Sequence, residues 1–204
     1  MILASTLLKQ IPWIQHGFGT REEPESQEGM ASLKQIHSSI SLSASRPGCM
    51  GEGDALITSS PDLPVSIRTA DCFPILLADM EHRAVAAIHA GWRGTDARIV
   101  VNTLLHMRAE FGTQPEKVAA AIGPGIGPCC YEVGEDVGQR FGLPGPGRLD
   151  LAAQNLRQLL DAGVPRAQIE HLEACTFCDA ARFYSWRRDH GQAGRMISYI
   201  SISG

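Results

Sequence analysis

Two histidines and one cysteine have the chemistry of metal ligands. His37 lies in the segment LKQIHSS, Cys72 in IRTADCFPILLAD and His89 in AAIHAGWRGT. Two imidazoles and one thiolate form a three-ligand zinc set of the kind that keeps a fourth coordination position open for water or substrate. The alternative is structural: Cys72 would be a small buried core residue, and both histidines would be hydrogen bonded to backbone groups.

Charged residues near these candidate ligands could take part in catalysis. Asp71 is a candidate for proton transfer because it is adjacent to Cys72, although neighbouring residues in a strand point to opposite faces. Arg21, Arg93 and Arg187 are candidate contacts for an anionic substrate, because a guanidinium group can donate two parallel hydrogen bonds to phosphate or carboxylate.

Glycines, prolines and cysteines are concentrated between positions 120 and 137, in AAIGPGIGPCCYEVGEDV. The residues from Gly123 to Pro128 cannot continue a strand, so the chain must bend there. This loop could present backbone amides to an anion, or it could be only a structural turn before a helix. The adjacent Cys129 and Cys130 are expected to point in different directions and not to chelate together.

The remaining cysteines are not expected to bind a metal. Cys175 and Cys178 form a single CxxC, with no second pair at a zinc-finger spacing. We therefore expect Cys72→Ala to abolish metal retention and Cys178→Ala to leave it unchanged. Six cysteines in a chain of this size without a recognisable secretion signal indicate reduced thiols in the cytoplasm.

Hydrophobic periodicity indicates a mixture of strands and helices. Short aliphatic runs between turn residues predict strands at 55–58, 65–68, 74–78, 84–89, 118–123, 169–174 and 196–202. Longer helices are predicted over 96–111 and 150–162, and shorter ones over 134–140 and 179–187. Thr95 or Asp96 and Asp150 are expected as N-caps, and Gly112 should end the first helix. The irregular spacing favours a mixed α/β, or α+β, fold with mixed sheets.

The composition fits a single domain over residues 1–204. The chain has 44% apolar residues and a formal net charge of −4, and at this length it can bury roughly 70% of its unfolded surface. The absence of basic runs argues against a nucleic-acid partner. No apolar stretch approaches the ~20 residues that cross a bilayer, so no membrane association is expected.

Several motifs, taken in order, resemble the YfiH/laccase-domain family, whose members are also named polyphenol oxidases and are associated with purine nucleosides. They are HGFGTR, KQIH, GDALIT, TADCFPILLAD, AAIHAGWRGT, AAIGPGIGPCCYEVG and FYSWRRDHGQAGR. The resemblance extends from about His16 to Ile200. It implies packed mixed β-sheets with helices on the outside, in a four-layer α/β/β/α arrangement. It also implies that His37, Cys72 and His89 bind zinc.

The same resemblance implies purine nucleoside phosphorylase activity on adenosine, inosine and methylthioadenosine, with adenosine deaminase activity in the same site. Arg21, Arg93 and Arg187 would then position phosphate. The segment between HGF and KQIH is shorter than in most members of the family and lacks an SLNLG-like run. An expected asparagine and part of a pocket wall are therefore missing, which leaves the choice of substrate open.

Three functional hypotheses follow. The leading one is a zinc-dependent purine nucleoside phosphorylase and deaminase with Cys72, His89 and Asp71 as catalytic residues. The second is a metal-free hydrolase of a peptidoglycan-precursor amide, in which His89 activates Cys72 as a nucleophile. The third is a non-catalytic metal-binding protein. Copper laccase chemistry is not expected, because it needs many histidines and the chain has seven, with no His-x-His pair.

Overall fold

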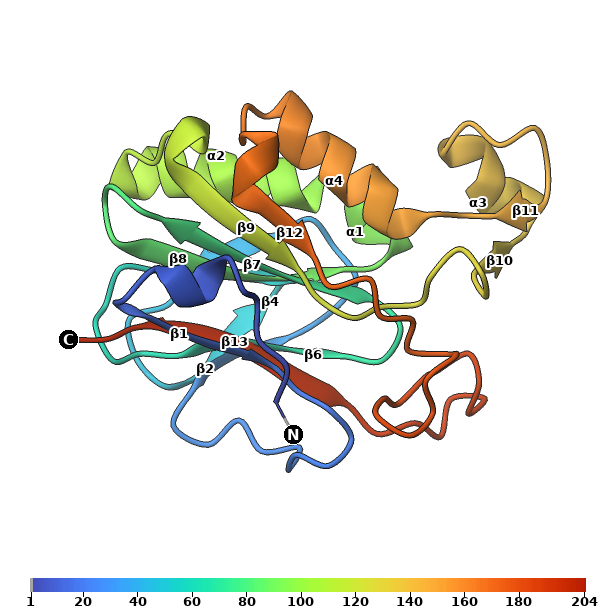
Figure 1. Ribbon diagram of the computed structural model, residues 1–204, viewed down its shortest axis with the longest axis horizontal. Coiled ribbons are helices and arrows are strands. Elements are labelled where there is room, and N and C mark those ends of the chain that lie inside the picture. The colour runs from blue at the N-terminus through green and yellow to red at the C-terminus, as the bar shows by residue number, and fades with distance from the viewer. Residues whose placement is uncertain (1) are drawn as a thin grey trace.

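Two mixed β-sheets pack against each other in the computed structural model, which describes residues 2–204 (Figure 1). The five-stranded sheet has the order β1 (Ile14–Phe18), β13 (Met196–Ile202), β6 (Val65–Thr69), β2 (Ala31–Lys34) and β4 (Gly48–Glu52). The six-stranded sheet has the order β12 (Ile169–His171), β9 (Val118–Ile122), β7 (Phe73–Asp79), β8 (Ala84–Ala90), β5 (Ala55–Thr58) and β3 (Ser41–Ser43).

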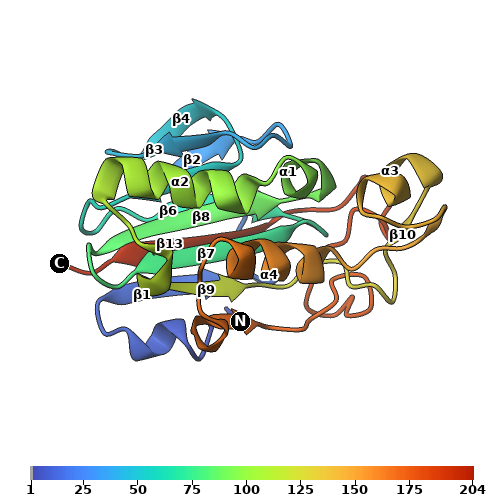
Figure 2. The same cartoon turned by 90° about the horizontal axis from the view of Figure 1, so that it is seen from above.

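The main helices cover the outer face of the six-stranded sheet (Figures 1 and 2). They are α1 (Trp92–Asp96), α2 (Ile99–Phe111) and α4 (Leu151–Asp161). At one end, α3 (Glu135–Arg140) lies in the segment that connects β10 (Glu132–Val133) to β11 (Gly147–Arg148), and these two short strands pair antiparallel (Figure 1). Single turns of 3₁₀ helix are η1 (Leu8–Gln10), η2 (Pro115–Lys117) and η3 (Arg166–Gln168). None of the helices in residues 2–204 has the length and apolar character that crossing a membrane requires.

The predicted α+β fold, with packed mixed sheets and external helices, is confirmed. The number of layers differs from the expectation. Within residues 2–204 no second layer of α-helices covers the five-stranded sheet, so the order is helix, sheet, sheet instead of α/β/β/α (Figure 1). One helical layer suffices because it covers the sheet whose central strands are apolar on both faces.

Strand β7 contributes to two separate hydrophobic cores. Leu76 and Ala78 pack between the two sheets, whereas Ile75 and Leu77 pack beneath the helices. All four side chains are fully buried. Successive residues of a strand point to opposite faces, and both faces of this strand are covered. The run of apolar residues that predicted the strand therefore reflects its central position in the fold.

Each predicted strand coincides with an observed one among β5 to β9, β12 and β13. Two predictions are too long, because β9 ends at Ile122 and β12 ends at His171. Asp150 is confirmed as the N-cap of α4, since its carboxylate accepts a hydrogen bond from the amide of Ala153 at 2.9 Å. The helix predicted over 96–111 is confirmed from Ile99 to Phe111, and Gly112 ends it as expected. Its predicted start is wrong, because Arg98 has a left-handed backbone (φ 60°) that separates α1 from α2. Thr95 and Asp96 accordingly lie in the last turn of α1 and do not cap α2.

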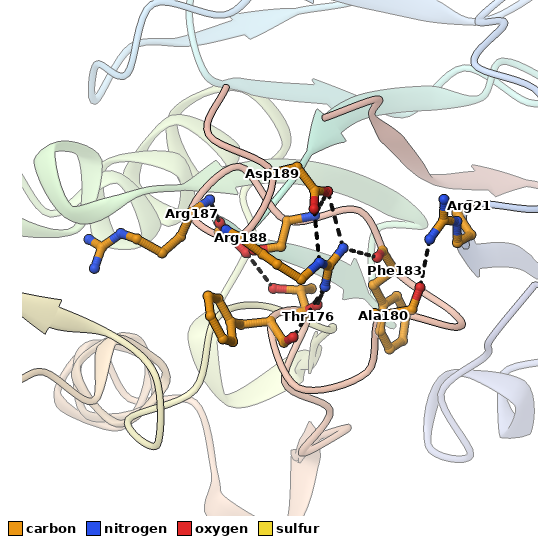
Figure 3. Close-up of polar contacts among 10 residues, drawn as sticks. Arg21, Thr176, Ala180, Phe183, Arg187, Arg188 and Asp189 are labelled. Carbon is orange, nitrogen blue, oxygen red and sulfur yellow. Dashed lines mark hydrogen bonds and ion pairs between the residues drawn. The ribbon is translucent and has the colours of Figure 1, made fainter. Parts of the chain in front are cut away.

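The helix predicted over 179–187 is also wrong, and this segment is a loop (Figure 3). The Arg188 guanidinium lies inside the loop and donates hydrogen bonds to the main-chain oxygens of Thr176, Phe177 and Phe183 and to the carboxylate of Asp189. The amide of Arg187 donates to the Asp71 carboxylate at 2.7 Å. Long-range side-chain partners thus satisfy backbone groups that a helix would have paired internally.

Candidate functional site

The side chains of His37, Cys72 and His89 converge from three segments. Their potential ligand atoms all lie within 4.8 Å of one another. Cys72 is in the turn between β6 and β7, His89 is near the end of β8, and His37 is in the loop after β2. The antiparallel pairing of β7 with β8 brings the residues around Cys72 and His89 together. The three side chains are close enough to bind one metal ion.

The buried carboxylate of Asp54 contacts both histidines, through the side chain of His89 and the backbone amide of His37. Its Oδ1 lies 2.8 Å from His89 Nδ1 and accepts a hydrogen bond from the His37 amide at 3.0 Å. Its Oδ2 accepts hydrogen bonds from the amide and the hydroxyl of Ser38 at 2.6 and 2.7 Å. His37 has a left-handed backbone (φ 59°), so these bonds stabilise an otherwise unfavourable conformation. Because Nδ1 of His89 is occupied, Nε2 remains as its ligand atom.

The electrostatics of the cluster favour a charged Asp54, a thiolate and an imidazolium. Burial by itself would raise the pKa of Asp54, but hydrogen bonds from His89 and Ser38 lower it to about 2. Burial would also raise the pKa of the Cys72 thiol, but the positive charge of His89 and hydrogen bonds with both histidines lower it. The thiolate and Asp54 in turn raise the pKa of His89 against the effect of its burial. A thiolate is the form of cysteine that binds metals and attacks electrophiles.

Gly91 leaves the space that the Cys72 sulfur occupies. A Cβ atom at this position would lie 2.9 Å from Cys72 Sγ and 3.4 Å from His37 Cδ2. Any other residue would therefore push against the Cys72 sulfur, while its contact with His37 would be an ordinary van der Waals contact. The glycine in HAGW has a steric role at the site.

The three side chains line a cleft of about 900 Å³. Its other lining residues include the cations Lys34, Arg68, Arg93, Arg187 and Arg195 and the aromatic residues Trp92, Tyr131 and Trp186. Two of the cations have carboxylate partners, since Lys34 pairs with Glu52 and Arg68 with Glu25. The Arg93 guanidinium lies 4.3 Å from the centre of the Trp92 ring and forms no hydrogen bond or ion pair with residues 2–204. The cleft suits a ligand with a planar ring and a negative charge.

The three predicted substrate arginines have different positions. Arg93 and Arg187 line the cleft. Arg187 also donates a hydrogen bond through Nη1 to the Glu132 carbonyl at 2.9 Å. Arg21 is not among the lining residues, and its Nη1 donates a hydrogen bond to the Ala180 carbonyl at 2.7 Å (Figure 3). Its guanidinium lies over the Tyr184 ring. Two of the three predicted arginines therefore lie at the cleft, and Arg21 does not.

Asp71 lines the cleft together with Cys72. Neighbouring residues in a strand would point to opposite faces, but Asp71 lies in a turn and has a φ of 84°. Both of its carboxylate oxygens have partners: Oδ1 accepts from the Thr176 hydroxyl and Oδ2 from the Arg187 amide, each at 2.7 Å. Asp71 thus holds the 176–187 loop against the cleft.

Asp54 and Tyr131 were not among the predicted site residues. Asp54 could have been found from its position directly before the fully buried strand β5, because a buried aspartate needs polar partners. Tyr131 follows the two adjacent cysteines, and its pKa is raised to about 12, chiefly by burial and secondly by the charge of Cys72. Its signal was its place in the segment 120–137, which the sequence marked as a possible anion-binding loop.

The chain is similar to a family model and to several curated proteins. A family model described as multi-copper polyphenol oxidoreductase laccase matches residues 20–203. The chain is 42% identical over 181 residues to a purine nucleoside phosphorylase of Deinococcus radiodurans, with 86% of this chain and 71% of the relative aligned. It is 35% identical over 161 residues to a protein of an unknown prokaryotic organism named adenosine deaminase RL5, with 72% of this chain and 61% of the relative aligned.

A solved structure has the same fold. The crystal structure of the Bacillus licheniformis hypothetical protein YfiH superposes with a TM-score of 0.88 at 26% sequence identity. The superposition covers 96% of this chain and 95% of that protein. The arrangement of the two sheets and their helices is therefore shared over almost the whole described chain.

Proposed function

This chain belongs to the family described as multi-copper polyphenol oxidoreductase laccase, and from that premise we propose that it is a zinc-dependent purine nucleoside phosphorylase with adenosine deaminase activity. The observation that carries the proposal is the position of His37, Cys72 and His89 on a cleft lined with cations and aromatic rings. The names of the phosphorylase and deaminase relatives support it. Adenosine, inosine and methylthioadenosine are the proposed nucleosides, and orthophosphate is the proposed second substrate.

The side chains fit zinc. Two imidazoles and one thiolate are common zinc ligands, and three protein ligands are typical of a catalytic zinc site. Asp54 supplies the carboxylate that usually orients a metal-bound histidine. When bound, Zn²⁺ would supply Lewis acidity to an oxygen atom of water or substrate. A copper laccase would also need a histidine-rich cluster, and in residues 2–204 none of the other five histidines joins a group of potential ligands.

The cleft residues have separate roles in the proposed reactions. In phosphorolysis, a phosphate oxygen bonds to C1′ of the ribose while the bond from C1′ to the purine nitrogen breaks and its electron pair leaves with the base. Arg93 and Arg187 would hold the phosphate through charge-assisted hydrogen bonds. The rings of Trp92, Tyr131 and Trp186 offer apolar faces for the purine.

Deamination would use the same cleft. Water replaces the amino group at C6 of adenine, ammonia leaves and inosine is formed from adenosine. Asp71 is the proposed proton-transfer group, since the residue lines the cleft beside Cys72. The hydrogen bonds from Thr176 and Arg187 keep this carboxylate in place.

A second function has specific geometric support. Asp54, His89 and Cys72 form a series in which a carboxylate orients an imidazole and the imidazole charge stabilises a thiolate. This is the arrangement of a metal-free hydrolase with a cysteine nucleophile. Such an enzyme could act on an amide bond, including one in a peptidoglycan precursor.

Incubation with adenosine, with and without phosphate, tests the proposal. Adenine that appears only with phosphate supports phosphorolysis, and inosine that appears without phosphate supports deamination. Both activities should disappear after treatment with a strong chelator and return with Zn²⁺. If zinc-loaded protein forms neither product, the proposal is contradicted. Hydrolysis of a peptidoglycan-precursor amide that resists the chelator would favour the cysteine hydrolase.

A further inference from the structure

Four cysteines outside the proposed active site lie together. Cys129, Cys130, Cys175 and Cys178 have their sulfur atoms within 4.8 Å of one another. Cys178 Sγ lies 3.2 Å from Cys130 Sγ and 3.6 Å from Cys129 Sγ. The expectation that the two adjacent cysteines point apart was therefore wrong, and the CxxC of 175–178 has a partner pair after all.

The topology brings the two cysteine pairs to the same place. Strands β9 and β12 are parallel neighbours, so the turns that follow them leave the same edge of the sheet. Cys129 and Cys130 lie in the first turn, and Cys175 and Cys178 lie in the second.

Backbone hydrogen bonds fix one turn against the other. The Gly125 amide donates to the Ala174 carbonyl at 3.2 Å, and the Thr176 amide donates to the Gly125 carbonyl at 3.0 Å. The Gly127 amide donates to Cys175 Sγ at 3.3 Å. A hydrogen bond of this kind stabilises the negative charge of a thiolate.

The sulfur positions fit a tetrahedral metal site. Zinc to sulfur bonds of about 2.3 Å in a tetrahedron place the sulfur atoms about 3.8 Å apart. The distances of 3.2 and 3.6 Å and the limit of 4.8 Å lie around that value. They are all longer than the roughly 2.05 Å of a disulfide bond, and all six cysteines carry free thiols. Four thiolates favour zinc over the hard, oxygen-binding cations.

We propose that Cys129, Cys130, Cys175 and Cys178 bind a structural Zn²⁺ ion, separate from the His37, Cys72 and His89 site. With four protein ligands the ion has no open position, which is typical of a structural site. The ion joins two loops that both contribute to the cleft. The first continues into Tyr131, and the second contains Thr176, which holds Asp71. The proposal does not depend on the reaction catalysed in the cleft.

The zinc content of four variants tests the proposal. Protein purified under reducing conditions from zinc-supplemented cells should contain two zinc ions per chain by elemental mass spectrometry. We expect Cys178→Ser and Cys72→Ser each to halve this content, and the double variant to contain none. Cys49→Ser is the matched control, because Cys49 is exposed and belongs to neither group, and it should retain two ions. An unchanged zinc content in Cys178→Ser would overturn the proposal.

X-ray absorption of zinc in Cys72→Ser gives a test that does not require the Cys178 variant to fold. The cysteine cluster is intact in this protein, so we expect four sulfur neighbours at about 2.3 Å. Nitrogen neighbours, iron in place of zinc, or no bound metal would overturn the proposal. A mass lower by two hydrogens in protein kept free of oxygen would also overturn it, because a disulfide would then occupy the site.

Discussion

Asp54 Oδ1 lies 2.8 Å from Nδ1 of His89. The same oxygen accepts a hydrogen bond from the amide of His37, whose backbone is left-handed. One buried carboxylate therefore fixes the ring of one candidate ligand and the main chain of another. The geometry of the proposed zinc site depends on this aspartate, although it is not itself one of the three ligands.

Replacing Asp54 with asparagine should weaken metal binding at the His37, Cys72 and His89 site by about 10-fold to 100-fold, because the amide cannot hold the His89 ring with the same charge. Competition with a chelator of known affinity measures the change. Asp79→Asn is the matched control, since Asp79 is also buried but lies at the other end of β7 and accepts from the amides of Glu81 and His82. Equal affinities in the two variants would contradict the role of Asp54.

Acid should destabilise the metal-free protein partly through the same residue. The pKa of Asp54 is lowered to about 2 in the folded state, against about 3.9 in an unfolded chain. Its ionisation therefore contributes on the order of 2 kcal/mol, which is fully present above about pH 4 and is lost as the pH falls towards about 2. Urea unfolding over this range should show a smaller pH dependence in Asp54→Asn than in the wild type. Identical slopes would refute the assignment.

Gly91→Ala should reduce metal affinity while the fold remains intact. The new methyl group would lie 2.9 Å from Cys72 Sγ, so the sulfur must move. The φ of Gly91 is −84°, which alanine adopts without strain. A loss of about tenfold or more in zinc affinity is expected, with little change in the circular dichroism spectrum. Gly145→Ala, with no atom within 4 Å of the added Cβ, is the control and should bind zinc normally.

Arg93→Ala should raise the KM for phosphate in the proposed phosphorolysis. Loss of a hydrogen bond to a charged group costs about 1.5–3 kcal/mol, which corresponds to a rise of roughly 10-fold to 100-fold. Steady-state kinetics with adenosine at saturation measures the effect. Arg21→Ala should leave this KM unchanged, because Arg21 does not line the cleft. A similar rise in both variants would exclude direct phosphate contact by Arg93.

The elements of the six-stranded sheet were predictable because their burial is visible in local sequence. The run in β7, for example, is apolar at every position that faces a core, and α4 has both a capping aspartate and a helical period. The loop over 179–187 was not predictable in this way. Its conformation depends on Asp71, more than a hundred positions away, and on the Arg188 guanidinium that fills its interior.

The residues able to do chemistry could be named from their types and from the family motifs that contain them, as for His37, Cys72 and His89. Which of these side chains contact one another became visible only in the folded chain. The pairing of β9 with β12 joins Cys129 and Cys130 to the CxxC of 175–178, and a buried Asp54 joins two histidines. These contacts connect segments that are distant in the chain, and local periodicity carries no information about which strands become neighbours.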